Sequence, residues 1–366
     1  MKSGHDDCMY MGNMMTHRLA CTTILTALSA VMLSGAVAAQ SNAPPADDFY
    51  KERQIRLIIG TDAGGSYDFS GRMVGRHIAK YIAGNPSIVV QNMPGAASLN
   101  AVNHVYNVAP QDGSVIAAPV QTAPQQELFG NPNVKFNSTK FQWLGNPNSS
   151  VPVVVVWHTV PIKTIADAFQ QTIIMGAAGR TSNDATLPAL LNNVLGTKFN
   201  VLAGYKGGNE VDLAMERGEV AGRASQTWDG WKVTRPDWVK TGKLTLLLQI
   251  GAASNTGLEK VPLASDIAKT EEQKQIIGLF SDTFSLGRPL LTGPGVPANR
   301  VAILRDAFNR TMTDKEFLAE AAKVGYEVTP LTGEEVQALI NHMMSAPAAI
   351  IDKARDAITY KDAKNP

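Results

Sequence analysis

Residues 61–68 hold the residue types and spacing that most favour ligand chemistry in this sequence. They run Thr-Asp-Ala-Gly-Gly-Ser-Tyr-Asp, after the apolar stretch 55–59 and before a segment with helical periodicity. A glycine-rich turn at the start of a helix leaves backbone N–H groups at the positive end of the helix dipole, where they bind anions without Lys or Arg. Gly64 and Gly65 also let a ligand approach the backbone closely. The alternative is an ordinary strand-to-helix turn capped by Ser66 or Asp68.

A second loop has the same placement. Residues 175–184 run Met-Gly-Ala-Ala-Gly-Arg-Thr-Ser-Asn-Asp, between an apolar strand and a helical segment. The loop adds two hydroxyl groups and the guanidinium of Arg180, whose planar fork suits a carboxylate. The alternative is a surface arginine on a capping loop. Because the two loops belong to separate α/β units, we expect them to face each other across a cleft.

Motifs for catalysis, cofactors and metals are missing from the sequence. The first loop has no P-loop lysine, no GxGxxG follows the first strand, and there is no GxSxG elbow. His77, His104, His158 and His342 are scattered without metal-ligand spacing. Asp62 could be paired with Asp68 as two acids, but a helix cap and a loop residue are favoured. We therefore expect no catalytic residue, no metal and no cofactor.

The elements that position these loops alternate between strand and helix patterns. Apolar strands are predicted at residues 55–59, 88–90, 115–118, 153–157, 173–176, 199–202 and 244–250. Helices are predicted from residue 67, and at 99–108, 164–171, 185–195, 210–217, 300–312, 316–324 and 334–343. Residues 283–286 and 290–291 are expected to be extended. This alternation is typical of an α/β fold with parallel sheets.

The N-terminal region predicts export. Residues 19–37 are apolar, follow His17 and Arg18, and end in small residues, which is the layout of a secretory signal peptide over residues 1–39. Translation could begin at Met14 or Met15, and residues 40–48 would form a flexible leader. The alternative is an uncleaved membrane anchor. Both cysteines, Cys8 and Cys21, precede the cleavage site, so the mature chain would lack thiols. The expected location is the periplasm.

Composition limits the partners. Lys and Arg number 33 against 32 Asp and Glu, a net charge of +1, which implies no broad basic face and argues against nucleic acid. Hydrophobic residues make up 44% and charged residues 18% of the chain, as in a soluble globular protein. Its 366 residues are enough for two domains.

Five motifs in order resemble the periplasmic receptors of tripartite tricarboxylate transporters, also called Bug receptors. Residues 63–68 are similar to P-G-G-x-x-D, 89–96 to V-E-N-R-P-G-A, 110–113 to P-D-G, 205–208 to Y-K-G-G, and 293–297 to P-x-G-x-P. The resemblance covers about residues 53–345. It implies a type II, Venus-flytrap fold with a cleft between two parallel or mixed sheets flanked by helices. Lobe 1 would span residues 49–157 and 275–366, and lobe 2 residues 158–274.

The resemblance also implies a function and a site. The expected function is a monomeric receptor that captures a small carboxylate for a membrane permease. A sensor for a signalling partner and an enzyme on the same fold are the alternatives. The implied ligand-binding residues are Ala63, Gly64, Gly65, Ser66, Asp68, Gly179, Arg180, Thr181 and Ser182. Asp68 would select ligands that carry an amino or amide group. Trp228 is a further candidate, which would either line the cleft or pack on lobe 2.

Overall fold

The computed structural model describes residues 48–149, 151–180 and 182–359. The expected signal peptide, residues 1–39, lies outside these residues, as do Thr181 and the leader up to residue 47. Within the described ranges, no helix is both long enough and apolar enough to cross a bilayer.

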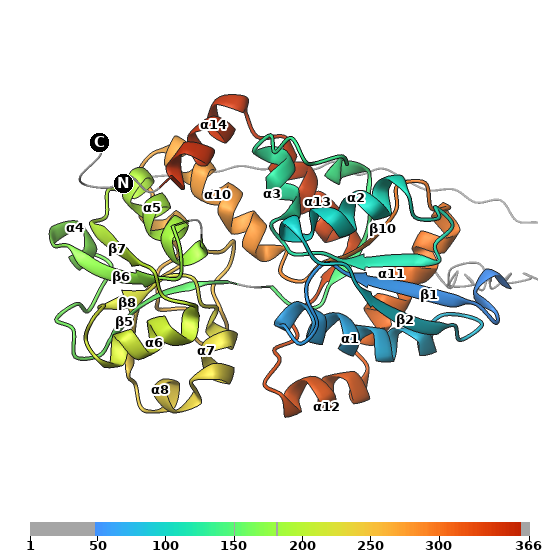
Figure 1. Cartoon of the computed structure of the whole chain (residues 1–366), viewed down its shortest axis with the longest axis horizontal. Coiled ribbons are helices and arrows are strands. Elements are labelled where there is room, and N and C mark those ends of the chain that lie inside the picture. Colours follow the sequence, from blue (N-terminus) through green and yellow to red (C-terminus); the bar gives the residue numbers. More distant parts are fainter. Residues whose placement is uncertain (1–47, 150, 181, 360–366) are drawn as a thin grey trace, which may run out of the picture. The chain divides into compact units, whose positions relative to one another are not determined.

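The first sheet has six strands in the order β11-β4-β10-β3-β1-β2. Strand β1 pairs in parallel with β2 and β3, and β10 pairs antiparallel with β3 and β4 (Figure 1). The strands are β1 (Gln54–Ile59), β2 (Ser87–Asn92), β3 (Val115–Ala118), β4 (Gln142–Asn146), β10 (Leu290–Thr292) and β11 (Leu331–Thr332). The carboxyl ends of β1 and β2 lead into the two segments that carry the first two family motifs.

The second sheet has five strands in the order β7-β6-β8-β5-β9, with parallel and antiparallel pairs. They are β5 (Val153–Trp157), β6 (Ile173–Ala177), β7 (Phe199–Ala203), β8 (Gly222–Arg223) and β9 (Leu244–Gln249). Strand β5 pairs with β9 and β8, so it belongs to this sheet. The first passage of the chain between the sheets therefore lies at residues 147–152, before the expected lobe boundary at residue 157.

Side chains of the central strands alternate between the two faces of each sheet, and both faces are buried. Ile55, Leu57 and Ile59 of β1 enter one apolar cluster, whereas Ile58 enters another. Strand β5 behaves in the same way, because its odd-numbered residues face one cluster and Val154 and Val156 the other. Successive side chains of a strand point to opposite faces, so a continuous apolar run needs a helical layer on each side.

Helices supply those layers. Helices α1 and α11 pack against the first sheet, α12 packs against both of them, and α2 and α13 contact β3 and β4; α5 and α6 pack against the second sheet. These helices are α1 (Ser66–Ile78), α2 (Leu99–Asn107), α5 (Asn183–Leu195), α6 (Gly208–Glu216), α11 (Ala298–Met312), α12 (Lys315–Lys323) and α13 (Gly333–Met344). The shorter helices are α3 (Ala123–Leu128), α4 (Asp167–Gln170), α7 (Trp228–Thr234), α8 (Pro236–Lys240) and α9 (Ala264–Ile267). The predicted α/β class, with two mixed sheets flanked by helices, is confirmed.

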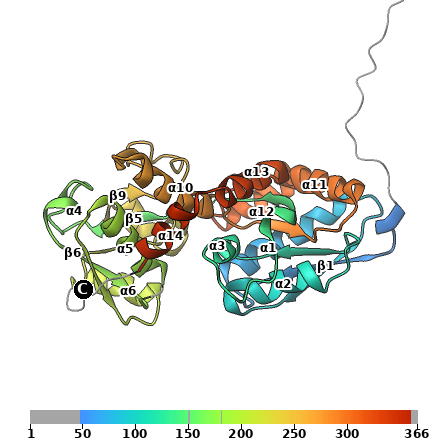
Figure 2. The same ribbon diagram turned by 90° about the horizontal axis from the view of Figure 1, so that it is seen from above.

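Helix α10 (Glu271–Ser285) corrects one expectation. Residues 283–286 were expected to be extended, but 283–285 form the last turn of this helix. A capping box between Thr270 and Gln273 starts the helix, and that signal was overlooked in favour of the short β-prone run. Helix α10 contacts α13, which covers the first sheet, and α5, which covers the second. Helix α14 (Ala348–Ala357) also packs on α5 (Figure 2).

Candidate ligand site

The glycine-rich loop leads directly into α1. The helix begins at Ser66 after an N-cap at Gly65 that makes no side-chain capping bond, so the expected cap at Ser66 or Asp68 is wrong. Gly64 has a φ of +86°, a left-handed conformation that favours glycine. Gly64, Gly65 and Ser66 are exposed, and a Cβ added to Gly64 would meet nothing within 4 Å. The backbone that leads into the first turn of α1 is therefore open to a ligand.

Asp68 holds this loop in place from beneath. Its buried carboxylate accepts the Gly64 N–H at 2.9 Å, the Arg72 Nε–H at 2.9 Å and the Asn92 amide at 2.8 Å. Burial alone would raise the pKa of Asp68, but hydrogen bonds from Arg72, Gly64 and Asn92 outweigh it and lower the pKa to about 2. With these donors already bound, the carboxylate organises the loop.

A cavity of about 500 Å³ opens in front of the loop. This volume is within the usual range for small-molecule sites. One wall comes from the loop and α1, a second from α7 and the residues before it, and a third from the segments around Arg288 and Tyr326. The lining residues are Gly64, Gly65, Ser66, Phe69, Gln226, Thr227, Asp229, Gly230, Val233, Thr234, Arg288, Val324, Gly325 and Tyr326.

Arg288 brings a cation to the cavity. Its guanidinium lies 5.7 Å from the ring centre of Tyr67 and 5.4 Å from that of Tyr326, and it donates to the Asn148 side chain. Its buried Nε has no hydrogen-bond partner among the described residues. Arg288 is part of the cavity lining, so its guanidinium supplies a positive charge to the cavity.

Gly287 fixes the position of that arginine. It has a φ of +53°, and a Cβ there would lie 1.8 Å from the Asn148 carbonyl oxygen. The chain leaving α10 thus runs directly against the first passage between the sheets. The Asn146 side chain accepts the Arg288 backbone N–H at 2.9 Å, which ties the two segments together.

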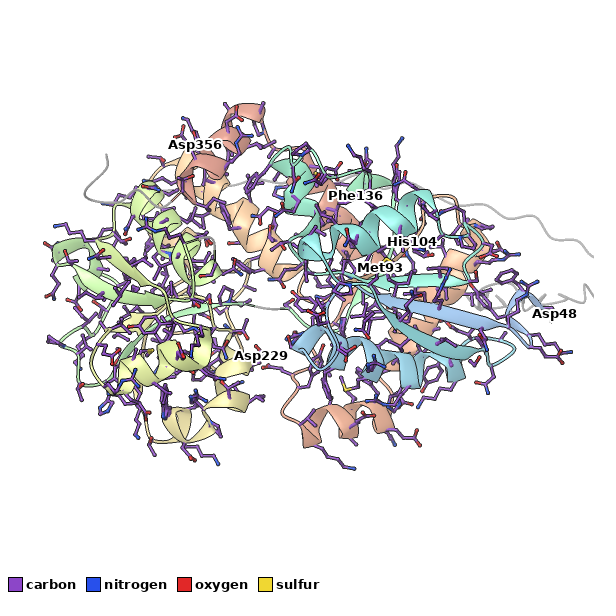
Figure 3. The ribbon with its side chains drawn as sticks, in the orientation of Figure 1. Asp48, Met93, His104, Phe136, Asp229 and Asp356 are labelled. Atoms are coloured by element: carbon purple, nitrogen blue, oxygen red, sulfur yellow. The ribbon has the colours of Figure 1, made fainter. Side chains whose placement is uncertain are left out.

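The α7 wall meets the opposite wall at one edge of the cavity. Lys232 Nζ lies 3.3 Å from a carboxylate oxygen of Glu327, and a Cβ on Gly325 would lie 3.2 Å from Val233. Asp229, in the first turn of α7, is the acidic residue of the lining. Figure 3 labels it at the edge of the α7 ribbon that faces α1.

The second predicted loop is built differently. Ser182 Oγ donates to the Gly179 carbonyl at 2.7 Å, so the loop closes on itself, and Arg180 is exposed. Below it, Asp184 accepts Arg223 Nε at 3.0 Å and Asp212 accepts Arg223 Nη1 at 3.1 Å. Burial raises the pKa of Asp212, although the guanidinium groups of Arg223 and Arg235 oppose that shift.

Trp228 starts α7 next to Asp229. It is partly buried against the apolar cluster of the second sheet that contains Trp231 and Trp238, and Lys232 Nζ lies 5.8 Å from its ring centre. It is not part of the cavity lining. The geometry therefore matches the packing alternative for this residue.

The structure brings only part of the predicted set together. Gly64, Gly65 and Ser66 line the cavity. The other predicted residues with described positions lie outside its lining: Ala63, Asp68, Gly179, Arg180, Ser182 and Trp228. Sequence reasoning missed Arg288, Tyr326 and Asp229. For Arg288 the available signal was weak: an arginine between a glycine and a proline, Gly287 and Pro289, ahead of a short apolar strand.

In the described part of the chain, one group of side chains has metal-ligand proximity. Ligand atoms of His77, Asp314 and Glu316 lie within 4.8 Å of one another. Lys80 Nζ already lies 2.7 Å from Asp314 and 3.2 Å from Glu316, so an ammonium group supplies the positive charge there. The cluster joins α1 to α12.

Comparisons with known proteins agree with this architecture. The family model of the tripartite tricarboxylate transporter family receptor matches residues 71–355. A Cupriavidus necator protein, described as the UPF0065 protein in the gbd 5′ region, is 27% identical, over 92% of this chain and 97% of its own length. A solute-binding protein structure from Polaromonas without ligand has a TM-score of 0.66 at 21% identity, covering 83% of this chain and 99% of that one. An R. palustris protein solved with adipate has a TM-score of 0.56 at 16% identity, covering 83% and 97%.

The family model spans every strand of the two sheets except β1, and nearly all the helices that cover them. The two mixed sheets match the solved solute-binding protein in fold. The resemblance drawn from five short motifs is thereby confirmed, and the chain belongs to the tripartite tricarboxylate transporter receptor family.

Proposed function

We propose that this protein captures a small organic carboxylate in the cavity at Arg288 and delivers it to the membrane permease of a tripartite transporter. The observation that carries the proposal is the Arg288 guanidinium, the cationic group of a cavity lining that also includes Gly64, Gly65 and Ser66. An arginine and a set of backbone N–H groups are complementary to a carboxylate. The adipate in the R. palustris structure supports the same ligand class.

The proposed site works by binding and not by reaction. The cavity lining has one guanidinium, one carboxylate and the tyrosine hydroxyl of Tyr326 as its titratable groups. The Tyr326 hydroxyl is already hydrogen-bonded to Ser70 at 2.8 Å. Burial raises the pKa of Tyr326, which keeps the hydroxyl protonated at neutral pH.

The proposed motion is closure of two lobes around the ligand. Lobe 1 would hold the first sheet and lobe 2 the second, with the chain passing between them at residues 147–152 and 250–289. Asn148 and Gly287 are in contact where these passages meet, so small backbone changes there would move α7 relative to α1. The closed form would present a new surface to the permease. The signal peptide expected over residues 1–39 would place this receptor in the periplasm.

The experiment is a thermal-shift screen of the purified protein against mono-, di- and tricarboxylates, aromatic acids and amino acids. A ligand at a hundredfold excess over its Kd adds about 2.7 kcal/mol to the free energy of unfolding. We expect a clear shift with one class of carboxylate that disappears in Arg288→Gln. Arg310→Gln, an exposed arginine of α11 paired with Asp306, is the matched control and should keep the shift. A ligand that is not a carboxylate, or binding unaffected by Arg288→Gln, would overturn the proposal.

A further inference from the structure

The cavity carries two opposite charges on opposite walls. Arg288 comes from the segment after α10, and Asp229 comes from the first turn of α7. Among the residues that the structure describes, no other Lys, Arg, Asp or Glu is part of this lining. The hydroxyl of Tyr326 is close enough to both that its pKa is lowered by Arg288 and raised by Asp229. The two charges therefore act on the same small volume.

Asp229 lies in the first turn of α7, where the helix dipole favours a negative charge. It is half-buried, and among the described residues its carboxylate makes no hydrogen bond or ion pair. The cap of α7 is instead supplied by Thr227, whose side chain accepts the Gly230 N–H at 3.2 Å. A carboxylate held at a cavity wall without a partner favours a cation in the cavity.

This charge pattern discriminates between ligand classes. A dicarboxylate anchored at Arg288 would bring its second negative charge toward Asp229, and the repulsion would weaken binding. A zwitterion would place its carboxylate at Arg288 and its ammonium group at Asp229, so that each charge has a partner. The cavity then holds no net charge after the ligand enters.

The rest of the lining specifies the body of the ligand. Phe69 is half-buried, while Val233 is 52% and Val324 is 44% exposed, and all three line the cavity. Covering large apolar side chains that are exposed at a cavity wall with an apolar group is favourable, because it removes apolar surface from water. Polar ligands without an apolar part would leave these apolar side chains exposed to water.

From this arrangement we infer that the ligand is an amino acid with an apolar side chain, selected over dicarboxylates by Asp229. The inference rests on the proposed receptor function and on Arg288 as its carboxylate anchor. It differs from the dicarboxylate found in the R. palustris structure. Asp229 accounts for this difference, because it would repel the second carboxylate of a dicarboxylate and attract the ammonium group of an amino acid.

The test uses three ligands that share one skeleton. Phenylalanine carries the amine, 3-phenylpropanoate lacks it, and benzylmalonate has a second carboxylate in its place. Leucine, 4-methylpentanoate and isobutylmalonate form the aliphatic counterpart. Isothermal titration calorimetry of the purified protein should give at least one amino acid whose Kd is tenfold to a hundredfold lower than that of its deaminated analogue. The malonate should bind more weakly than either.

The variant Asp229→Asn should remove that discrimination. We expect the amino acid to lose tenfold or more in affinity, the deaminated analogue to change little, and the malonate to gain affinity. Asp237→Asn removes an exposed acid from the first turn of α8 and should leave all three values unchanged. Circular dichroism melts in the absence of ligand check that both variants fold as the parent does.

Failure of the inference and failure of the receptor function are distinguishable. If a malonate or another dicarboxylate binds as tightly as the amino acid, and Asp229→Asn does not change the ratio, the inference is overturned while the receptor function stands. If no amino acid binds but another carboxylate does, and Arg288→Gln abolishes that binding, the inference is again overturned while the receptor function stands. If no carboxylate of any kind binds, both proposals fall.

Discussion

Asn92 donates its side-chain N–H to the Asp68 carboxylate at 2.8 Å and, through the same amide nitrogen, to the Thr61 carbonyl at 2.9 Å. Asn92 is the last residue of β2, and Asp68 lies in the first turn of α1. Arg72 completes the cluster, since its Nη2 donates to the Asn92 oxygen at 2.7 Å. Two motifs that are separate in the sequence therefore act as one support for the glycine-rich loop.

Replacing Asp68 should cost stability as well as loop order. In Asp68→Asn the new amide nitrogen faces donors from Arg72 and Gly64, so buried donors lose their acceptor. The free energy of unfolding should fall by about 2 kcal/mol, measured by urea denaturation at pH 7. Asp62→Asn in the same loop is the control, because Asp62 is exposed and the change should stay within about 0.5 kcal/mol.

The same substitution should change the pH dependence of stability. Asp68 has a pKa of about 2 in the folded protein, below the usual range of an unfolded aspartate. Its contribution is therefore complete above the unfolded pKa and is lost as the pH falls through the folded value. The gap in stability between the parent and Asp68→Asn should be constant above about pH 5 and narrow toward pH 2. A gap that does not depend on pH would contradict the ionised network.

Arg223 should be among the most sensitive positions of the second sheet. It bonds both Asp184 and Asp212, and its side chain is 11% exposed. Arg223→Leu would remove the arginine of Asp184 and one of the two arginines of Asp212, which keeps Arg235 at 2.9 Å, at a cost of about 3 kcal/mol in the free energy of unfolding. Burial already raises the pKa of Asp212, so the deficit should shrink in acid as the Asp212 carboxylate takes up a proton.

Arg217→Leu is the matched control for that prediction. Arg217 pairs with Glu219 at 2.6 Å, but both side chains are about half exposed, at 55% and 45%. An exposed ion pair contributes less than about 1 kcal/mol. Equal losses in the two variants, measured by urea denaturation, would argue against a buried network at Arg223.

Gly287→Ala should affect both stability and binding. A Cβ at this position would meet the Asn148 carbonyl oxygen at 1.8 Å, in addition to the strain of a φ of +53°. We expect a loss of about 3 kcal/mol or more and a weaker ligand affinity, because the following residue is Arg288. Gly130→Ala separates the two causes: its φ is +72°, but nothing lies within 4 Å of an added Cβ. The control should lose about 1–2 kcal/mol, the conformational share alone.

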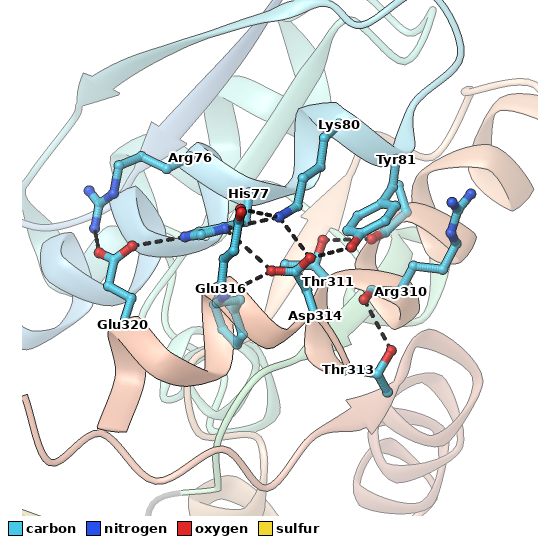
Figure 4. Close-up of polar contacts among 12 residues, drawn as sticks. Arg76, His77, Lys80, Tyr81, Arg310, Thr311, Thr313, Asp314, Glu316 and Glu320 are labelled. Carbon is cyan, nitrogen blue, oxygen red and sulfur yellow. Dashed lines mark hydrogen bonds and ion pairs between the residues drawn. The ribbon is translucent and has the colours of Figure 1, made fainter. Parts of the chain in front are cut away.

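Asp314 should couple α12 to the cavity. It caps α12 by accepting the Phe317 N–H at 2.8 Å, and it also binds Lys80 and Tyr81 of the segment that follows α1 (Figure 4). Helix α12 ends one residue before Val324, which lines the cavity. Asp314→Ala should cost about 2 kcal/mol and speed hydrogen exchange over residues 315–326, whereas Asp314→Asn keeps the cap and should cost less.

The control for this prediction is Asp306→Ala, which removes an exposed partner of Arg310 on α11. It should change neither the exchange rates of residues 315–326 nor the free energy of unfolding by more than about 0.5 kcal/mol. Unchanged exchange in Asp314→Ala would show that α12 stays docked without the carboxylate.

Local patterns determined much of the architecture. Apolar runs such as Val153–Trp157 and Val115–Ala118 were located to the residue, because a strand buried on both faces needs an unbroken apolar stretch. The glycine-rich loop before α1 was also identified from sequence, since a turn of that kind is a local feature. The five ordered motifs were sufficient to predict the family.

Tertiary structure decided the composition of the candidate site. Arg288 and Tyr326 lie far along the chain from Gly64, and only the return of the chain to the first sheet brings them to one cavity. Strand β5 joined the second sheet because long-range packing, and not local propensity, sets which strands pair. The partners of Asp68 were hidden for the same reason: a hydrogen bond to Asn92 depends on register between neighbouring strands, which no local pattern encodes.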